Sequence, residues 1–133
     1  MNETAHIPVS LLTPSLRERL LANGRLSGFD HLPVVKFFNP VGIGTWLATE
    51  LDPDGDTLYG LAQLNDAPEL GSFSLAELAT LVLPVGMRIE RDLFFSAAFP
   101  ISAYAEAALQ TGSINGAIRV LANAARAGGG ECT

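Results

Sequence analysis

A chain of 133 residues is long enough to form one domain with its own hydrophobic core. Its 14 acidic and 8 basic residues give a net charge of −6, and Lys36 is the sole lysine, which argues against a surface that binds nucleic-acid phosphates. The single cysteine, Cys132, excludes an intrachain disulfide, and the lack of an apolar run of signal-peptide or membrane-spanning length predicts a cytoplasmic protein that binds no membrane.

The first predicted element is a short helix near the N-terminus. Thr13 followed by Pro14 is typical of a helix start, because the threonine side chain caps free backbone amides and proline fits the first turn. Leucines then recur at helical spacing until Asn23-Gly24 provides a stop. Residues 1–9 have no periodic pattern, and we expect them to form a mobile tail.

Three strands joined by turns are predicted next, at Val34–Asn39, Thr45–Leu51 and Thr57–Leu64. These runs are rich in aliphatic, β-branched and aromatic residues. Their short connections favour an antiparallel meander, because parallel neighbours need crossovers of about a dozen residues or more.

A helix and a fourth strand follow the meander. Ser74 is predicted to cap the helix start while Glu77 reaches back to the serine's backbone amide. Pro84 ends this helix, and Met87–Phe95 then alternates between apolar and polar residues as a strand does.

Alanine-rich sequence after residue 100 predicts a helical hairpin, with helices at Ala103–Gln110 and Ile114–Ala127. The second helix has an apolar stripe that we expect to pack on the sheet or on a second copy of the chain. This stripe includes Ile114, Ile118 and Leu121.

Together these elements predict the α+β class. We expect an antiparallel sheet of about four strands with an N-terminal helix, one inserted helix and a C-terminal helical hairpin. The predicted domain covers residues 10–127, with a core at 34–95 and a helical extension at 101–127. A second mobile tail is expected at 128–133.

The turn at residues 52–56 places aspartates at the first, third and fifth positions, as an EF-hand calcium loop does. The likeness ends there, since Thr57 stands where the loop needs glycine and Gln63 stands where it needs glutamate. We therefore interpret this segment as a solvated hairpin turn, and the sequence predicts neither a metal site nor a cofactor.

Two charged residues interrupt apolar strand faces. Alternation places Arg91 on the apolar face of Met87–Phe95, and it places Glu50 on the same face as Trp46. Buried charges are tolerated mainly when they are paired, so one interpretation is an internal ion pair between Arg91 and Glu50. The other is a pocket in which Trp46, Glu50, Glu69 and Arg91 bind a ligand or a partner's side chain.

Four stretches between residues 36 and 95 resemble a known bacterial family. They read KFFNP, TWLATE, ELGSFSLAEL and IERDLFF, and they begin at Lys36, Thr45, Glu69 and Ile89. The family is the domain-of-unknown-function family numbered 2958, small proteins often met among plasmid and integrative-element genes. The resemblance covers residues 10–97 and leaves out the alanine-rich end from Ile101 onward. It implies a small α+β domain in a bacterial mobile element, with no catalytic residues to carry over.

Our leading functional hypothesis is a non-catalytic interaction or accessory module of a bacterial mobile element. It would bind a protein partner, or a second copy of itself as a homodimer, and it would not bind nucleic acid directly. The alternative is a small hydrolase that uses paired carboxylates around a divalent metal. The carboxylates available to it are those of Glu50, Glu69, Glu90 and Asp92.

Overall fold

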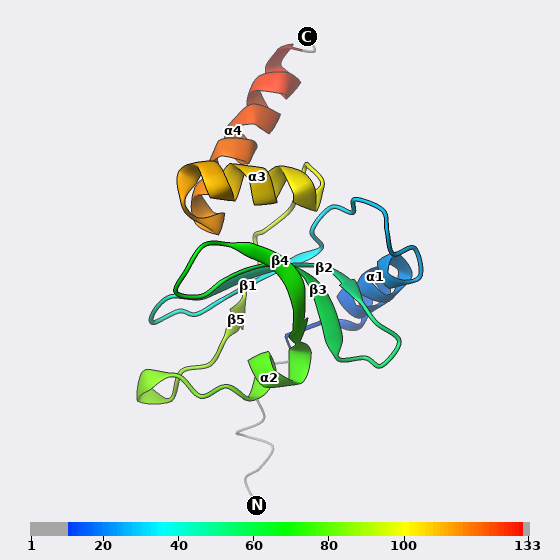
Figure 1. The fold of residues 1–133 in the computed structure, drawn as a ribbon, viewed down its shortest axis with the longest axis vertical. Helices are drawn as coiled ribbons and strands as arrows, with labels where there is room; N and C mark the ends of the chain where they lie inside the picture. Colours follow the sequence, from blue (N-terminus) through cyan, green and yellow to red (C-terminus); the bar gives the residue numbers. More distant parts are fainter. Residues whose placement is uncertain (1–10, 132–133) are drawn as a thin grey trace, which may run out of the picture.

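The centre of the structure is an antiparallel sheet of five strands, where the sequence predicted about four. The computed structural model describes residues 11–131, and in them the strand order is β4-β3-β2-β1-β5 (Figure 1). Strands β1 to β4 form a meander, and β5 joins the sheet beside β1. The strands are β1 (Val35–Phe38), β2 (Thr45–Leu51), β3 (Thr57–Gln63), β4 (Glu69–Ser74) and β5 (Glu90–Arg91). The predicted α+β class is confirmed.

Helices cover both faces of this sheet (Figure 1). Helices α1 (Pro14–Gly24) and α2 (Leu75–Thr80) lie on one face, and α3 (Ile101–Thr111) and α4 (Ile114–Glu131) lie on the other. A short 3-10 turn, η2 (Pro84–Gly86), lies between α2 and β5. Within residues 11–131, none of the helices has the length and apolar character needed to span a membrane.

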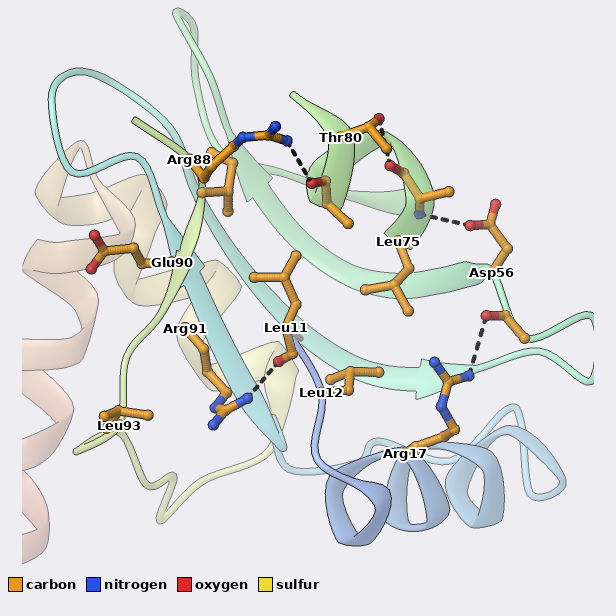
Figure 2. Close-up of a pocket in the computed structure, with 14 residues that line it drawn as sticks. Leu11, Leu12, Arg17, Asp56, Leu75, Thr80, Arg88, Glu90, Arg91 and Leu93 are labelled. Atoms are coloured by element: carbon orange, nitrogen blue, oxygen red, sulfur yellow. Dashed lines mark hydrogen bonds between the residues drawn. The ribbon is translucent and has the colours of Figure 1, made fainter. Parts of the chain in front are cut away.

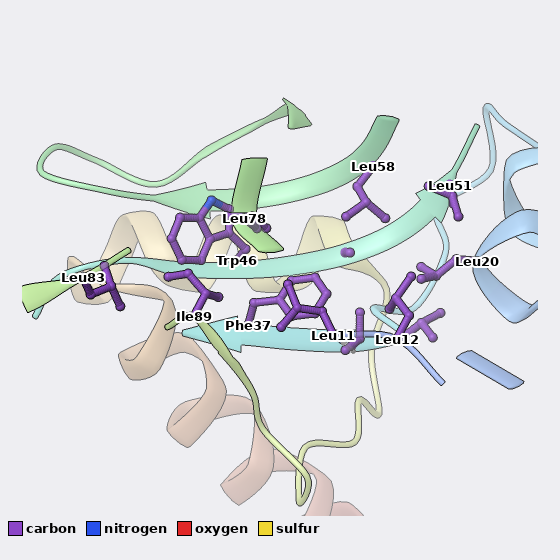
Figure 3. Close-up of a cluster of buried hydrophobic side chains, with 13 residues drawn as sticks. Leu11, Leu12, Leu20, Phe37, Trp46, Leu51, Leu58, Leu78, Leu83 and Ile89 are labelled. Atoms are coloured by element: carbon purple, nitrogen blue, oxygen red, sulfur yellow. The ribbon is translucent and has the colours of Figure 1, made fainter. Parts of the chain in front are cut away.

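The larger hydrophobic core lies between the sheet and the helices α1 and α2. Phe37 and Trp46 extend from the sheet into this core, where they pack in one cluster with Leu20 of α1 and Leu78 of α2 (Figure 3). Helix α1 approaches the sheet closely at its C-terminal end. A Cβ atom on Gly24 would lie 2.3 Å from a backbone oxygen of β2, so only glycine fits at this position.

The smaller core lies on the opposite face, where α3 and α4 pack on Leu47 and Leu61 of the sheet. Gln63 holds the junction of the two helices. Its amide nitrogen donates to the Gly112 carbonyl at 3.1 Å, and its amide oxygen accepts from the Ile114 amide at 3.0 Å. The predicted apolar stripe of α4 packs in this core, with Ile114 fully buried and Ile118 and Leu121 partly buried.

The caps predicted at Thr13 and Ser74 are confirmed, whereas the predicted return bond from the Ser74 amide to the Glu77 side chain is not present. The Thr13 hydroxyl accepts from the Leu16 amide at 3.1 Å, and the Ser74 hydroxyl accepts from the Glu77 amide at 3.1 Å. Helix α4 differs, because it continues to Glu131 and so includes residues that were predicted to form a tail. The tails expected at 1–9 and 132–133 lie outside the described residues.

Two strands differ from the prediction. Strand β4 forms six consecutive pairs with β3, from Thr57 opposite Ser74 to Ala62 opposite Glu69, in a segment that the sequence reading treated as a connection. The strand predicted at Met87–Phe95 is reduced to the two residues of β5. A tight turn around η2 shortens it, since Val82 pairs with Arg88 in an isolated bridge before the chain reaches the sheet.

Candidate functional site

The four residues predicted to form a pocket do not come together. Cross-strand pairing places three of them in one row across the sheet, on the face that α1 and α2 cover. From one edge to the other, the row consists of Arg91, Phe37, Trp46, Ala62 and Glu69. Arg91 and Glu69 are therefore separated by four strand spacings, roughly 19 Å. Trp46 between them is 5% exposed and belongs to the core.

Glu50 lies on the other face of the sheet, so the prediction that it shares a face with Trp46 is wrong. A β-bulge between Ala48 and Glu50 adds one residue to β2 and reverses the alternation beyond it. The inserted residue is Thr49, whose hydroxyl donates to the Tyr59 carbonyl at 3.1 Å and whose carbonyl accepts from the α1 side chain of Asn23 at 2.9 Å.

Arg91 meets a backbone carbonyl rather than the carboxylate of Glu50. Its Nη1 atom donates to the Leu11 oxygen at 2.8 Å, and the bond is partly buried (Figure 2). The predicted ion pair between Arg91 and Glu50 is therefore wrong, although Arg91 does lie on an apolar face as expected. Its contact fixes the segment that leads into α1 against β5.

The acidic turn at residues 52–56 supports local structure. The Asp54 carboxylate accepts from the amides of Asp56 and Thr57 and from the Thr57 hydroxyl at 2.7–2.9 Å. Hydrogen bonding from the Thr57 amide, and then from the Asp56 amide, lowers the pKa of Asp54 below its ordinary value of 3.8. Asp56 bonds the start of α2 instead, accepting from the Ala76 amide and the Ser74 hydroxyl, each at 2.8 Å.

The four carboxylates required by the hydrolase alternative do not form one cluster. Glu69 and Glu90 belong to opposite edge strands of the sheet. Asp92 pairs with Lys36, the Nζ and Oδ2 atoms lying 3.5 Å apart. In the part of the chain that the structure describes, no three His, Cys, Asp or Glu side chains are grouped in a way that could hold a metal ion.

The face that carries α1 and α2 has an open groove of about 820 Å³ (Figure 2). Helix α2 forms one wall, and the segment from Arg88 to Leu93 forms another. Leu11, Leu12 and Ile89 supply apolar surface between these walls. Mostly apolar concave sites of this size are typical of ligand and peptide binding.

Three arginines line this groove, which we call the arginine groove. Arg17 lies at one end beside the β2–β3 turn, whereas Arg88 and Arg91 lie at the other end beside β5 (Figure 2). Arg17 Nη1 donates to the Gly55 carbonyl at 3.4 Å, and Arg88 Nη1 donates to the Ala79 carbonyl at 3.3 Å. These long hydrogen bonds give the guanidinium groups of Arg17 and Arg88 a backbone contact each.

A family of proteins of unknown function, DUF2958, matches residues 11–115 of the chain. The chain belongs to this family. The match continues past the predicted limit at residue 97, so the family includes α3 and the beginning of α4. No curated protein and no solved structure matches the chain.

The DUF2958 match includes the described residues that line the arginine groove, from Leu11 to Leu93. Sequence reasoning identified Arg91 but missed the groove, because Arg17 reads as one more charge on the solvent face of a helix. The η2 turn, between α2 and β5, contains one strained residue. Val85 has φ of 54° and is 90% exposed, a left-handed conformation that β-branched residues avoid.

Proposed function

We propose that this DUF2958 protein is a non-catalytic interaction module that binds a segment of a partner protein in the arginine groove. The observation that carries the proposal is the groove itself, which combines about 820 Å³ of space with an apolar lining and the side chains of three arginines. Pockets of this kind bury apolar side chains and use a few polar groups to orient the bound segment.

Exposed apolar side chains beside the groove support a protein as the partner. Leu93 lines the groove and is 72% exposed, and the adjacent Phe94 is 94% exposed. Large aromatic and aliphatic side chains in water are costly unless a partner covers them, and aromatic residues are enriched at protein interfaces. A bound segment that continued past the groove would cover this surface.

The setting we propose is that of an accessory protein of a bacterial mobile element, acting in the cytoplasm. The family resemblance supports the mobile element, and a single cysteine in the chain suits a reducing compartment. The net charge of −6 supports a protein partner over nucleic acid. The hydrolase alternative is less well supported, because Glu69 and Glu90 lie on opposite edge strands and Asp92 pairs with Lys36.

Filling the groove tests the proposal. Ala79 is an exposed residue of α2 that lines the groove, whereas Ala124 is exposed on α4 away from it. Peptides of roughly ten residues would be selected on the full chain from a random displayed library, then measured on Ala79→Trp and Ala124→Trp.

We expect Ala79→Trp to weaken the selected peptides about tenfold or more and Ala124→Trp to leave them unchanged. Thermal unfolding of both variants would verify that each is folded. The proposal is wrong if the library yields no binders, or if the binders are indifferent to the tryptophan at position 79.

A further inference from the structure

We infer that the outer edge of β4 pairs with the same edge of a second copy of this chain, in an antiparallel arrangement. The two five-stranded sheets would then form one continuous sheet. This surface is separate from the arginine groove, because none of the residues of β4 lines that groove. The inference therefore goes beyond the proposed function and does not depend on it.

Strand β4 forms one edge of the sheet, and its outer side is open. Within residues 11–131, β4 pairs with β3, and its other contacts are chiefly with α2. A strand at an edge directs backbone N–H and C=O groups outward, where they can pair with another strand. In the described part of the chain, no hydrogen bond links the backbone of Leu70–Phe73 to a segment other than β3. This part of β4 can therefore accept a further strand.

Strand β4 lacks the features with which proteins usually block an edge strand. Those features include a short length, a bulge, a proline and charged side chains. All six residues of β4 pair with β3 without a register shift, and its one charged residue, Glu69, lies at the first position. The opposite edge differs, because β5 is only two residues long. Of the two edges, that of β4 is the one suited to the addition of a strand.

Exposed side chains and a glycine at this edge support close approach by another chain. Leu70 is 44% exposed, and Tyr59, its diagonal neighbour on β3, is 36% exposed. Gly71 lies within β4, although its φ is not left-handed and a Cβ there would have nothing within 4 Å. One copy of the chain therefore does not require glycine at this position, where it weakens the strand. Since the pairing has no bulge here, the glycine indicates that another backbone comes close.

The sequence of β4 is complementary to itself in one antiparallel register. A two-fold axis at Ser72 pairs this residue with its own copy and places Phe73 opposite Gly71 of the second chain. The aromatic ring would cover the glycine, an arrangement that stabilises strand pairs. The two Glu69 side chains would lie beyond the paired residues, roughly 20 Å apart along the strands, so their repulsion is screened.

This self-complementarity is the reason for choosing a second copy as the occupant. An axis shifted by one residue would pair Gly71 with itself and place the Glu69 carboxylate opposite Phe73, so the register at Ser72 is preferred. The pairing is shorter than a standard protein interface, so we expect a weak dimer with a Kd of about 10–100 μM. Each copy has a net charge of −6, and added salt should therefore tighten the dimer.

Residue 72 tests the pairing, because a residue on a two-fold axis always meets its own copy. Ser72→Asp would place two carboxylates opposite each other, and Ser72→Lys would place two ammonium groups there, so each variant alone should pair poorly. A mixture of the two variants places opposite charges together, and pairing should return. Ser27→Asp and Ser27→Lys are the matched controls, since Ser27 is an exposed serine in the loop between α1 and β1.

Sedimentation equilibrium of the full chain would measure the dimer, and thermal unfolding would verify that each variant is folded. We expect each Ser72 variant alone to raise the Kd about tenfold or more, and the Ser27 variants to match the wild type. An equimolar mixture of the Ser72 variants should dimerise again, and native mass spectrometry should identify the product as the mixed dimer.

Three results would overturn the inference. The first is a wild-type chain that stays monomeric up to roughly 1 mM. The second is a dimer that neither Ser72 variant weakens, because the copies would then associate through another surface, such as the apolar stripe of α4. The third is a mixture of the Ser72 variants that stays monomeric although both are folded, because the two copies of residue 72 would then not lie opposite each other.

Discussion

Asp56→Ala should destabilise the domain by removing the support of α2. Asp56 Oδ1 accepts from the Ala76 amide and Oδ2 from the Ser74 hydroxyl, each at 2.8 Å. A hydrogen bond to a charged group contributes about 1.5–3 kcal/mol, and loss of a helix cap costs about 0.5–2 kcal/mol. The site is only partly buried, so we expect the free energy of unfolding to fall by roughly 2–3 kcal/mol in total.

Urea denaturation measures this loss as a shift of the midpoint at an unchanged slope. Asp52→Ala is the matched control, because Asp52 is an exposed acid of the same turn whose backbone, rather than its carboxylate, bonds Gly55 and Thr57. We expect the control to change stability by about 0.5 kcal/mol or less. Because α2 forms one wall of the arginine groove, Asp56→Ala should also weaken peptide binding.

Two results would refute this reasoning. If Asp52→Ala and Asp56→Ala destabilise equally, the loss reflects general charge in the turn and not the support of α2. If millimolar calcium raises the melting temperature of the wild-type chain by several degrees but not that of Asp56→Ala, the turn binds an ion and the structural interpretation is wrong.

Other substitutions test the sheet, the strained turn and the acid response. Gly60→Ala should lower the free energy of unfolding by about 3 kcal/mol, because the new Cβ would lie 1.8 Å from the Leu47 backbone oxygen. Gly71→Ala is the control in the same urea assay and should be tolerated, because its Cβ would have nothing within 4 Å. Val85→Asn should raise the free energy of unfolding by about 1 kcal/mol, since asparagine tolerates φ of 54° better than valine. The pKa of Asp54 lies below 3.8 in the folded state, so the carboxylate stabilises the fold above that pH, and this contribution is lost as pH falls through the folded pKa. Asp54→Asn should therefore lower the free energy of unfolding at neutral pH. It should also flatten the pH dependence of unfolding below pH 3.8.

The features that sequence reasoning predicted are those with local causes. Thr13 and Ser74 bond amides three residues ahead, so their role as caps is visible in a window of four residues. The meander of β1 to β3 follows from alternating strands and short turns in the same way.

The features that it missed depend on partners distant in the sequence. Strand β4 exists because β3 offers an open edge, and its residues carry no strong strand signal of their own. The bulge at Thr49 is held by Tyr59 on the next strand and by Asn23 on α1, so period-two counting from Trp46 could not detect it. Because of this one inserted residue, Glu50 lies on the face of the sheet opposite to Trp46.

The arginine groove depends both on local sequence patterns and on contacts between distant residues, and Arg91 illustrates the two. Strand alternation correctly placed its charge on an apolar face, but the choice of partner depends on which polar atoms the fold brings to that point. One of its partners is the carbonyl of Leu11, 80 residues earlier in the chain, and a carbonyl carries no signature in a sequence. This bond holds the Leu11 backbone beside β5, and Leu11 contributes apolar surface to the groove. The residue that sequence reasoning took for a binding group is therefore better understood as one that holds the binding surface in place.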